Sequence, residues 1–418
     1  MSEILRNIGK LLTANIVAQA LGILVYPVLT RMYSPEDFGL LNLFMSIGGI
    51  GVIVSTLGYH DAVVLPKDER RSVGLVQLCV IATLCVVLLV GLTIPFSGPI
   101  AALFNSPAMA RWWWLMPFYI GGMAFWNTIS NYYLRRKAFL GISIYQVSQS
   151  LFSAAGKIVL GVFGWVSGGM IVSSVVAPFL AIGASLSYGG KLLKTALLPV
   201  PKAEMQTIAR EYRNFPCYSL PRSLVNVFGS NMPVLLLTPV FGLEEVGFFG
   251  MALTLALRPL QLIVQSAYQV LYQRSSQQVN DLQPIGPLLF GFMKKTGALF
   301  IPLFALLYWG LPWMTEWLLG GGWKVCGEYI RLLLPWLLVM TIVAPVGFVT
   351  DVFGKQKMAF AIEVVYTVLR IGALMIGIAL HDFRMALLLF SLSSALVIAG
   401  QAGWYIALIR RHDRQVSA

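Results

Sequence analysis

Five basic residues lie deep within apolar stretches of this chain: Lys157, Arg222, Arg258, Arg331 and Arg370. A cation at the centre of a membrane-spanning helix costs roughly 2.5 to 3.5 kcal/mol even on a lenient insertion scale, so five of them require a compensating interaction. Carboxylates at similar depth are too few to pair with all five, because only Glu363 lies comparably far inside such a stretch. The five cations therefore predict a water-filled cavity that binds an anion.

Polar side chains recur at helical spacing in the same stretches. Residues at i, i+3, i+4 and i+7 share one face of a helix, so polar residues at this spacing mark a side that is turned away from lipid. We interpret the following residues as lining the cavity or contacting a polar substrate: Asn15, Gln19, Asn226, Gln261, Gln265, Tyr268 and Gln269. For the Asn and Gln residues, interhelical hydrogen bonds within a membrane bundle are an equally open interpretation.

Glu363 lies two helical turns before Arg370, on the same face. It could pair with Arg370 or carry a proton that is coupled to transport, and the sequence leaves both roles open. Lys157 and Arg331 are expected nearer the outer surface, where they could belong to the anion site or only anchor their helices at the interface. The four cysteines and three histidines show no metal-ligand or disulfide spacing, so we expect no metal and no cofactor.

Membrane-spanning helices must position these residues. Hydrophobic residues make up 58% of the 418 residues and charged residues only 11%, whereas soluble domains carry about a quarter charged residues. Apolar runs of about 20 residues, the length that crosses a bilayer as a helix, recur along the whole chain. We therefore predict an all-α integral membrane protein with twelve transmembrane helices. Their expected ranges are 8–30, 38–60, 72–95, 112–134, 142–163, 166–188, 214–240, 246–272, 288–311, 327–350, 358–380 and 384–408.

Basic residues in the predicted loops and tails fall almost entirely on one side of the membrane. With a cytoplasmic amino terminus, the inner loops and tails hold 21 Lys and Arg residues and the outer loops hold four. Short loops rich in Lys and Arg stay in the cytoplasm, so both termini are expected there. The same distribution explains the net charge of +13 through topology and attraction to anionic lipids. Nucleic acid is therefore not an expected partner.

The chain divides into two halves of similar pattern. The longest polar connection, residues 190–213, is expected to be a cytoplasmic linker between a six-helix lobe at 1–189 and a second six-helix lobe at 214–418. The sequence SPEDFG at residues 34–39 is echoed by GLEEVG at residues 242–247, an offset of 208. Because each lobe has an even number of spans, the first span of both lobes starts on the same side of the membrane. A pseudo-two-fold axis along the membrane normal should therefore relate the two lobes. Such pairs hold substrate near the midplane and rock to give alternating access.

Several motifs resemble one family of membrane transporters. They are YPVLTRMYSPEDFG at residues 26–39, DAVVLPKD at 61–68, RPL at 258–260 followed by polar residues up to Gln273, and GEY at 327–329 ahead of Pro335. In this order they resemble the Wzx-type O-antigen and oligosaccharide flippases of the multidrug/oligosaccharidyl-lipid/polysaccharide exporter superfamily. The resemblance extends over nearly the whole chain.

This resemblance implies a two-lobed bundle of twelve helices in the bacterial inner membrane that acts as a transporter and not as an enzyme. Its substrate would be an undecaprenyl-pyrophosphate-linked oligosaccharide, moved from the cytoplasmic to the periplasmic leaflet for O-antigen or capsule synthesis by proton- or sodium-driven antiport. Arginine can bind phosphate oxygens in a bidentate manner, so the pyrophosphate would be bound by the deep cations. Gln, Asn and Tyr side chains would contact sugar hydroxyls. Other partners would be membrane lipids and further polysaccharide assembly proteins.

Three alternatives fit the same residues less well. A multidrug or cation antiporter of the same superfamily would be expected to place carboxylates in the cavity, whereas this chain places mainly cations there. A lipid II flippase usually carries additional spans. A membrane-embedded polysaccharide polymerase or ligase needs a large outer loop with catalytic groups, but the longest outer loops, about 96–111 and 312–326, are short. The sequence also lacks a phosphate-binding glycine loop, a zinc-ligand helix and a nucleophile elbow.

Overall fold

The computed structural model describes residues 16–196 and 199–417. Every regular element in these two ranges is a helix and no strand occurs there, which confirms the predicted all-α class. The helices form two compact units: unit 1 ends at Gly247 and unit 2 begins at Phe248. This boundary follows the seventh predicted span, whereas the sequence favours one at 190–213. How the spans group into two six-helix lobes stays a prediction.

Eight helices in the described ranges are long and apolar enough to cross a membrane, judged by length and composition. One of them, Phe215–Asn280, contains Gly242 with a non-helical backbone (φ 85°, ψ 177°) and is long enough for two spans joined at this break. The chain is therefore a multi-pass membrane protein, while the total of twelve spans stays a prediction. The eight ranges are Pro35–Ser55, Glu69–Gly91, Gly168–Gly190, Phe215–Asn280, Gly286–Leu319, Gly321–Val352, Gln356–Ala379 and Phe383–Val416.

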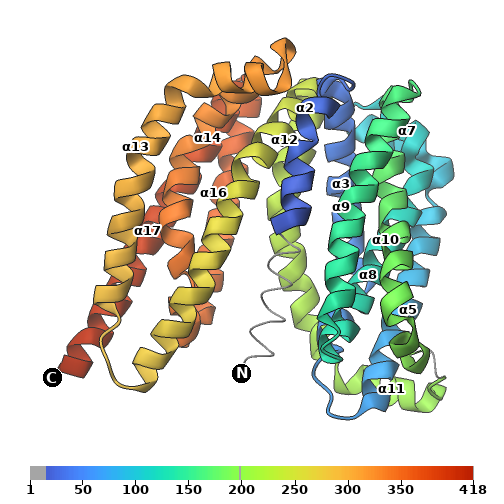
Figure 1. The fold of residues 1–418 in the computed structure, drawn as a ribbon, viewed down its shortest axis with the longest axis horizontal. Coiled ribbons are helices and arrows are strands. Elements are labelled where there is room, and N and C mark those ends of the chain that lie inside the picture. Colours follow the sequence, from blue (N-terminus) through green and yellow to red (C-terminus); the bar gives the residue numbers. More distant parts are fainter. Residues whose placement is uncertain (1–15, 197–198, 418) are drawn as a thin grey trace. The chain divides into compact units, whose positions relative to one another are not determined.

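Unit 1 begins with helical residues 16–24 and continues through α2 to α11 and the first part of α12 (Figure 1). Within it, α9 packs along α10, and α8 packs against α3, α5 and α10. The bounds are α2 Tyr26–Leu29, α3 Pro35–Ser55, α4 Tyr59–Ala62, α5 Glu69–Gly91, α6 Ser97–Leu103, α7 Pro107–Trp112, α8 Met116–Arg135, α9 Phe139–Val162, α10 Val166–Ala196, α11 Lys202–Glu211 and α12 Leu220–Asn280.

The SPEDFG motif fixes the start of α3. Pro35 occupies the first helical turn, where its missing N–H would have had no intrahelical partner. The Ser34 Oγ accepts the Asp37 N–H at 3.3 Å, and the Asp37 carboxylate accepts the Ser34 N–H at 2.9 Å. This capping box satisfies two backbone donors that the helix itself leaves unpaired, so α3 begins at a defined residue.

Gly39 and Gly247 mark the point where the two related motifs touch. A methyl group at Gly39 would overlap the carbonyl oxygen of Leu243, and one at Gly247 would overlap the carbonyl oxygen of Pro35. Pro35 and Leu243 are 208 residues apart in the chain. Gly39 and Gly247 are separated by the same number of residues. The two contacts are therefore equivalent: the glycine of each motif approaches the corresponding carbonyl of the other motif. Glycine permits this approach because it has no Cβ.

Unit 2 contains the second part of α12 and the long helices α13, α14, α16 and α17 (Figure 1). α14 packs against both α13 and α17, and α16 packs along α17. α13 has 34 residues and continues past Pro302 and Pro312 to Leu319, whereas the prediction ended this span at residue 311. The bounds are α13 Gly286–Leu319, α14 Lys324–Val343, α15 Val349–Val352, α16 Gln356–Ala379 and α17 Phe383–Ser417.

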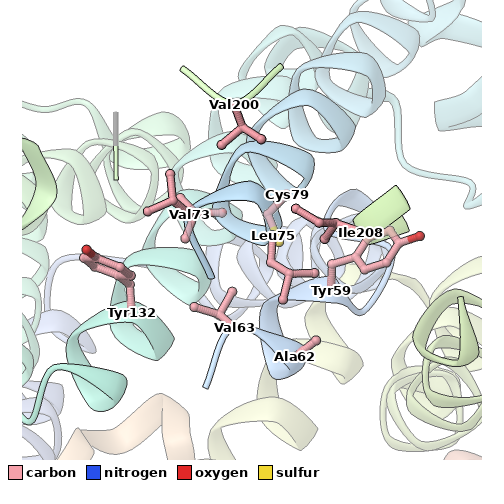
Figure 2. Packing of buried hydrophobic residues seen from close by; sticks show 10 residues of the cluster. Tyr59, Ala62, Val63, Val73, Leu75, Cys79, Tyr132, Val200 and Ile208 are labelled. Carbon is pink, nitrogen blue, oxygen red and sulfur yellow. The ribbon is translucent and has the colours of Figure 1, made fainter. Parts of the chain in front are cut away.

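The polar connection at 190–213 is largely helical, because α10 extends into it and α11 occupies its second half. Ile208 of α11 and the preceding Val200 are buried in one hydrophobic cluster, which Figure 2 shows from close by. Both side chains thereby leave water, which stabilises the attachment of α11 to the first half of α5. The cluster also contains Tyr59, Ala62, Val63, Val73, Leu75, Val76, Cys79 and Tyr132.

Two ion pairs hold the polar side of α11 to the beginning of α5. Arg70 pairs with Glu204 at 2.9 Å, and Arg71 pairs with Glu211 at 2.8 Å. Both pairs are partly exposed, so each adds little to stability, but together they fix the direction in which α11 crosses α5. The connection is therefore part of unit 1.

Candidate functional site

The second part of α12 presents a basic and polar face. Arg258 is half-buried, and Gln261, Gln265 and Gln269 follow it on the same side with exposed side chains. Three amide groups at intervals of one turn can donate to and accept from a polar ligand along about 12 Å of helix. The predicted stripe is thus accessible, and its binding role stays a prediction.

Tyr268 differs from the other members of this stripe. Its ring centre lies 6.0 Å from that of Tyr272 and 5.7 Å from that of Phe348. Phe348 is fully buried, so Tyr268 packs with one edge onto the hydrophobic core of unit 2. A structural contribution therefore accompanies whatever contact its hydroxyl makes with a ligand.

Arg222 and Asn226 lie on the first part of α12, in unit 1, and both side chains are exposed. No carboxylate of the described ranges lies within ion-pairing distance of the Arg222 guanidinium. A π-helical turn at Phe215–Ser219 and the adjacent Pro221 precede Arg222. π-helical turns occur frequently at functional sites, and an unpaired exposed arginine is free to bind an anion.

Arg370 on α16 is surrounded by aromatic rings. Its guanidinium carbon lies 4.4 Å from the ring centre of Phe390, 4.8 Å from that of Tyr366 and 5.6 Å from that of Trp336. Aromatic faces attract cations, so these rings offset part of the cost of the buried charge. The Arg370 Nε and the Trp336 Nε1 are buried without a hydrogen-bond partner among the described residues. Arg370 therefore contacts α14 and α17, inside unit 2.

Glu363 does not pair with Arg370. Its side chain is exposed, and no ion pair within 4.0 Å joins the two residues, although both lie in the described part of α16. The Glu363 backbone carbonyl accepts the Thr367 hydroxyl at 3.0 Å. The sequence left two roles open for Glu363, an ion pair with Arg370 and the binding of a proton coupled to transport. The structure shows no such ion pair, and the coupling role stays a prediction.

Lys157 and Arg331 lie toward the helix ends that carry the predicted outer loops. Lys157 is half-buried near the end of α9, and its carbonyl accepts the Tyr33 hydroxyl at 2.6 Å. The Arg331 guanidinium carbon lies 4.4 Å from the ring centre of Tyr308 on α13. Because the five cations are divided between the two units, their convergence on one anion stays a prediction.

Asn15 lies outside the described residues. Gln19 lies on helical residues 16–24, and its Oε1 is buried without a partner among the described residues. The carbonyl of the neighbouring Ala18 accepts the Ser150 hydroxyl of α9 at 2.7 Å, so this helical segment contacts α9. This arrangement is compatible with either a cavity or interhelical contacts.

Two polar residues of α9 with buried side-chain oxygens were not included in the predicted site. The Tyr145 hydroxyl and the Gln146 Oε1 are buried and have no partner in the part of the chain that the structure describes. The Tyr145 ring stacks on Trp126 of α8, with ring centres 3.4 Å apart. Gln146 lies one helical turn before Ser150, so this spacing was the available signal, whereas the stacking required the three-dimensional structure.

His60 lies in the short helix α4, outside the spanning helix Pro35–Ser55, whereas the predicted span extended to residue 60. Its Nδ1 is 2.8 Å from the Thr56 Oγ1, and its Nε2 is 3.4 Å from the Asp61 carboxylate. Burial lowers the pKa of His60 from its ordinary value, and the Asp61 charge opposes this only in part. The neutral imidazole is therefore favoured in the folded protein.

Acidification is expected to destabilise unit 1 through His60. Since the folded-state pKa lies below the unfolded value of 6.5, the unfolded chain binds more protons between the two values. The free energy of unfolding should be greatest above the unfolded-state pKa of 6.5 and should fall as the pH drops below 6.5. The decrease should end once the pH lies below the folded-state pKa of His60. Thermal unfolding of purified protein from about pH 8 to about pH 5 measures the loss, which His60→Gln should reduce. An unchanged pH profile in the variant would contradict this origin.

The fold resembles that of solved membrane transporters. At 11% identity, a lipid II flippase MurJ in an inward closed conformation matches 97% of this chain and 90% of its own, with a TM-score of 0.69. An outward-facing multidrug resistance MATE transporter of the MOP superfamily matches at 12% identity, over 99% and 96% of the two chains, with a TM-score of 0.57. The chain therefore has the fold of flippases and transporters of this superfamily.

The chain belongs to the polysaccharide biosynthesis protein family, whose model matches residues 28–328. A curated relative, the succinoglycan biosynthesis transport protein ExoT of Rhizobium meliloti (strain 1021), is 20% identical over 327 residues. That alignment covers 75% of this chain and 64% of the relative.

Proposed function

We propose that this protein moves undecaprenyl-pyrophosphate-linked oligosaccharides from the cytoplasmic to the periplasmic leaflet for O-antigen or capsular polysaccharide synthesis. Membership of the polysaccharide biosynthesis family supports an exported saccharide as the cargo. The likeness of its fold to a lipid II flippase supports translocation of a lipid-linked molecule. The protein would lie in the bacterial inner membrane with both termini in the cytoplasm, which agrees with the distribution of Lys and Arg in its loops.

The observation that carries this proposal is the combination of a cation and accessible amides on one face of α12. Arg258 would bind pyrophosphate oxygens, and Gln261, Gln265 and Gln269 would exchange hydrogen bonds with sugar hydroxyls. Arg222 would bind the same anionic group from the first part of α12. The lobes would rock around the bound lipid-linked saccharide, which gives alternating access.

The remaining predicted residues would have secondary roles. Lys157 and Arg331 would meet the pyrophosphate nearer the outer leaflet, and Arg370 would add positive potential from within unit 2. The exposed Glu363 would carry a proton or bind Na⁺ and so couple translocation to an ion gradient. Asn15, Gln19, Asn226 and Tyr268 would line the path of the saccharide.

A multidrug exporter is the second candidate function, because multidrug transporters share this fold. DinF-BH, solved in complex with R6G, matches with a TM-score of 0.57 at 16% identity. We favour the lipid-linked saccharide because four arginines and one lysine, but a single glutamate, occupy the deep positions of this chain. A cationic drug would be repelled by that excess of positive charge.

Gene deletion and complementation test the proposed function. Loss of the protein should remove surface polysaccharide and cause lipid-linked repeat units to accumulate in the cytoplasmic leaflet, and a plasmid copy should restore both. Radiolabelled lipid-linked saccharide, probed for accessibility on each side of inverted vesicles, measures the accumulation. Normal surface polysaccharide combined with altered drug sensitivity would instead establish the exporter.

A further inference from the structure

Three carboxylates at the end of unit 1 that carries α11 are paired with basic side chains of the same unit. Glu69 accepts the Tyr132 hydroxyl at 2.8 Å and pairs with Arg136 at 3.2 Å. Glu204 and Glu211 of α11 are paired with the first two arginines of α5, as described above. Asp68 accepts the Arg70 N–H at 3.1 Å as the N-cap of α5. These contacts leave little negative charge to compensate the other cations nearby.

Five further cations at this end are exposed and have no ion pair with any described residue. They come from three places: the turn before α5, the turn after α8, and α11 with the residues that follow it. We call this set the basic rim, and it consists of Lys67, Lys137, Lys202, Arg210 and Arg213. Asp61 and Asp68 are the described carboxylates of this end without a charged basic partner, and the five unpaired cations outnumber them, so the rim carries a net positive charge.

Direct contacts hold the parts of the basic rim together. The Arg135 guanidinium at the end of α8 donates to the carbonyls of Pro66 and Lys67, so the turns that carry Lys67 and Lys137 are neighbours. α11 packs on α5, and Figure 1 shows it at the same end of unit 1. The five cations therefore lie at one end of unit 1.

Exposed leucines border the basic rim. Leu65 is 61% exposed, Leu134 is 44% exposed and Leu140 is 42% exposed. Each lies within three residues of Lys67 or Lys137 in the chain. Exposed apolar side chains next to lysines mark the boundary between the hydrocarbon region and the headgroups, because the lysine stem follows the apolar surface while its ammonium group reaches the polar layer.

We propose that the basic rim binds the phosphate groups of anionic phospholipids in the leaflet at this end of the protein. Charge complementarity favours these lipids over zwitterionic ones, and the adjacent leucines favour a lipid over an acidic protein surface, since they would contact acyl chains. Lysines at headgroup depth act as mobile point charges, whereas Arg210 and Arg213 can form paired hydrogen bonds with one phosphate. The binding is independent of the translocated molecule, so it holds whether or not the proposed function is correct.

The first experiment compares lipid retention by purified full-length protein. The probes are phosphatidylglycerol and phosphatidylcholine offered in equal amounts, and native mass spectrometry counts the lipids of each kind that remain bound. The test variant replaces Lys67, Lys137, Arg210 and Arg213 by Gln. The control replaces Arg31, Arg111, Lys324 and Arg384 by Gln, which changes the net charge equally through exposed residues at the predicted outer ends.

The wild-type protein and the control should retain more phosphatidylglycerol than phosphatidylcholine. In the test variant the ratio of the two bound lipids should be at least about fivefold lower, because one cation at headgroup depth contributes about 1 kcal/mol. Higher salt should weaken the preference in the wild-type protein. Equal preference in the test variant and the wild-type protein would overturn the proposal, and so would an equal loss in the control. If the fourfold variant is not produced in folded form, Lys67→Gln with Lys137→Gln tests the same point, because both side chains are exposed and unpaired in the described structure.

Discussion

Replacing Arg258 by alanine is expected to reduce translocation roughly 10- to 150-fold without lowering the amount of protein in the membrane. A hydrogen bond to a charged group contributes about 1.5 to 3 kcal/mol, and each 1.4 kcal/mol corresponds to a factor of ten. Alanine removes the charge and both donors of the fork that would bind the pyrophosphate. Arg222→Ala should act in the same direction. Restoration of surface polysaccharide in a deletion strain, scaled to protein level, measures both effects.

Arg258→Lys separates charge from geometry. Lysine retains the positive charge but cannot form two parallel hydrogen bonds, so we expect partial activity. Arg274→Ala is the matched control, because Arg274 lies on the same helix, is exposed and has no assigned contact with the substrate. If Arg258→Ala and Arg222→Ala both export at the wild-type rate, the anion-binding cavity is wrong. An equal loss in Arg274→Ala would point to a general effect of charge on this helix.

Alanine at Gly39 or Gly247 is expected to destabilise the protein by about 3 kcal/mol or more, the upper range for overpacking. At each position the added methyl group would meet a backbone carbonyl, which cannot change rotamer as a side chain does. Relief would require the two helix ends to separate, which disturbs the capped start of α3 as well. Thermal unfolding in detergent, monitored by circular dichroism, measures the loss.

Gly49→Ala provides the control on the same helix as Gly39. A methyl group at Gly49 would come no closer than 4.0 Å to the amide nitrogen of Asn231, which is an ordinary contact. We expect this variant to be as stable as the wild-type protein or slightly more stable, because alanine favours the helix over glycine. Equal melting temperatures for Gly39→Ala and Gly49→Ala would contradict the close backbone contact.

Much of the helical architecture could be predicted because apolar runs report directly on lipid exposure. The start of α3 is encoded locally by Ser34, Pro35 and Asp37, whose spacing is that of a capping box, whereas the predicted span began at residue 38. The polar face of α12 was readable from glutamines one turn apart. Both signals are local, so no knowledge of neighbouring helices was needed.

Other features depended on contacts between distant segments. The rings around Arg370 come from three helices, so the spacing on α16 alone could not predict them. That spacing left an ion pair with Glu363 open, and the structure shows none within 4.0 Å. The docking of α11 rests on Val200 and Ile208, and the burial of Ile208 depends on Gly74 leaving room for it on α5. No periodicity predicts either arrangement.

The reciprocal contact of Gly39 and Gly247 has the form of an isologous interface. In such an interface both partners use the same surface. Here Gly39 meets the carbonyl of Leu243, and Gly247 meets the carbonyl of Pro35, which is the residue equivalent to Leu243 in the other motif. A chain of half this length with one such turn would make the same contact with a second copy of itself. The present polypeptide thus joins covalently what two identical subunits would otherwise form by symmetry. A duplication of an ancestral homodimer would produce this arrangement, and the glycine on each side would then have been inherited with the interface.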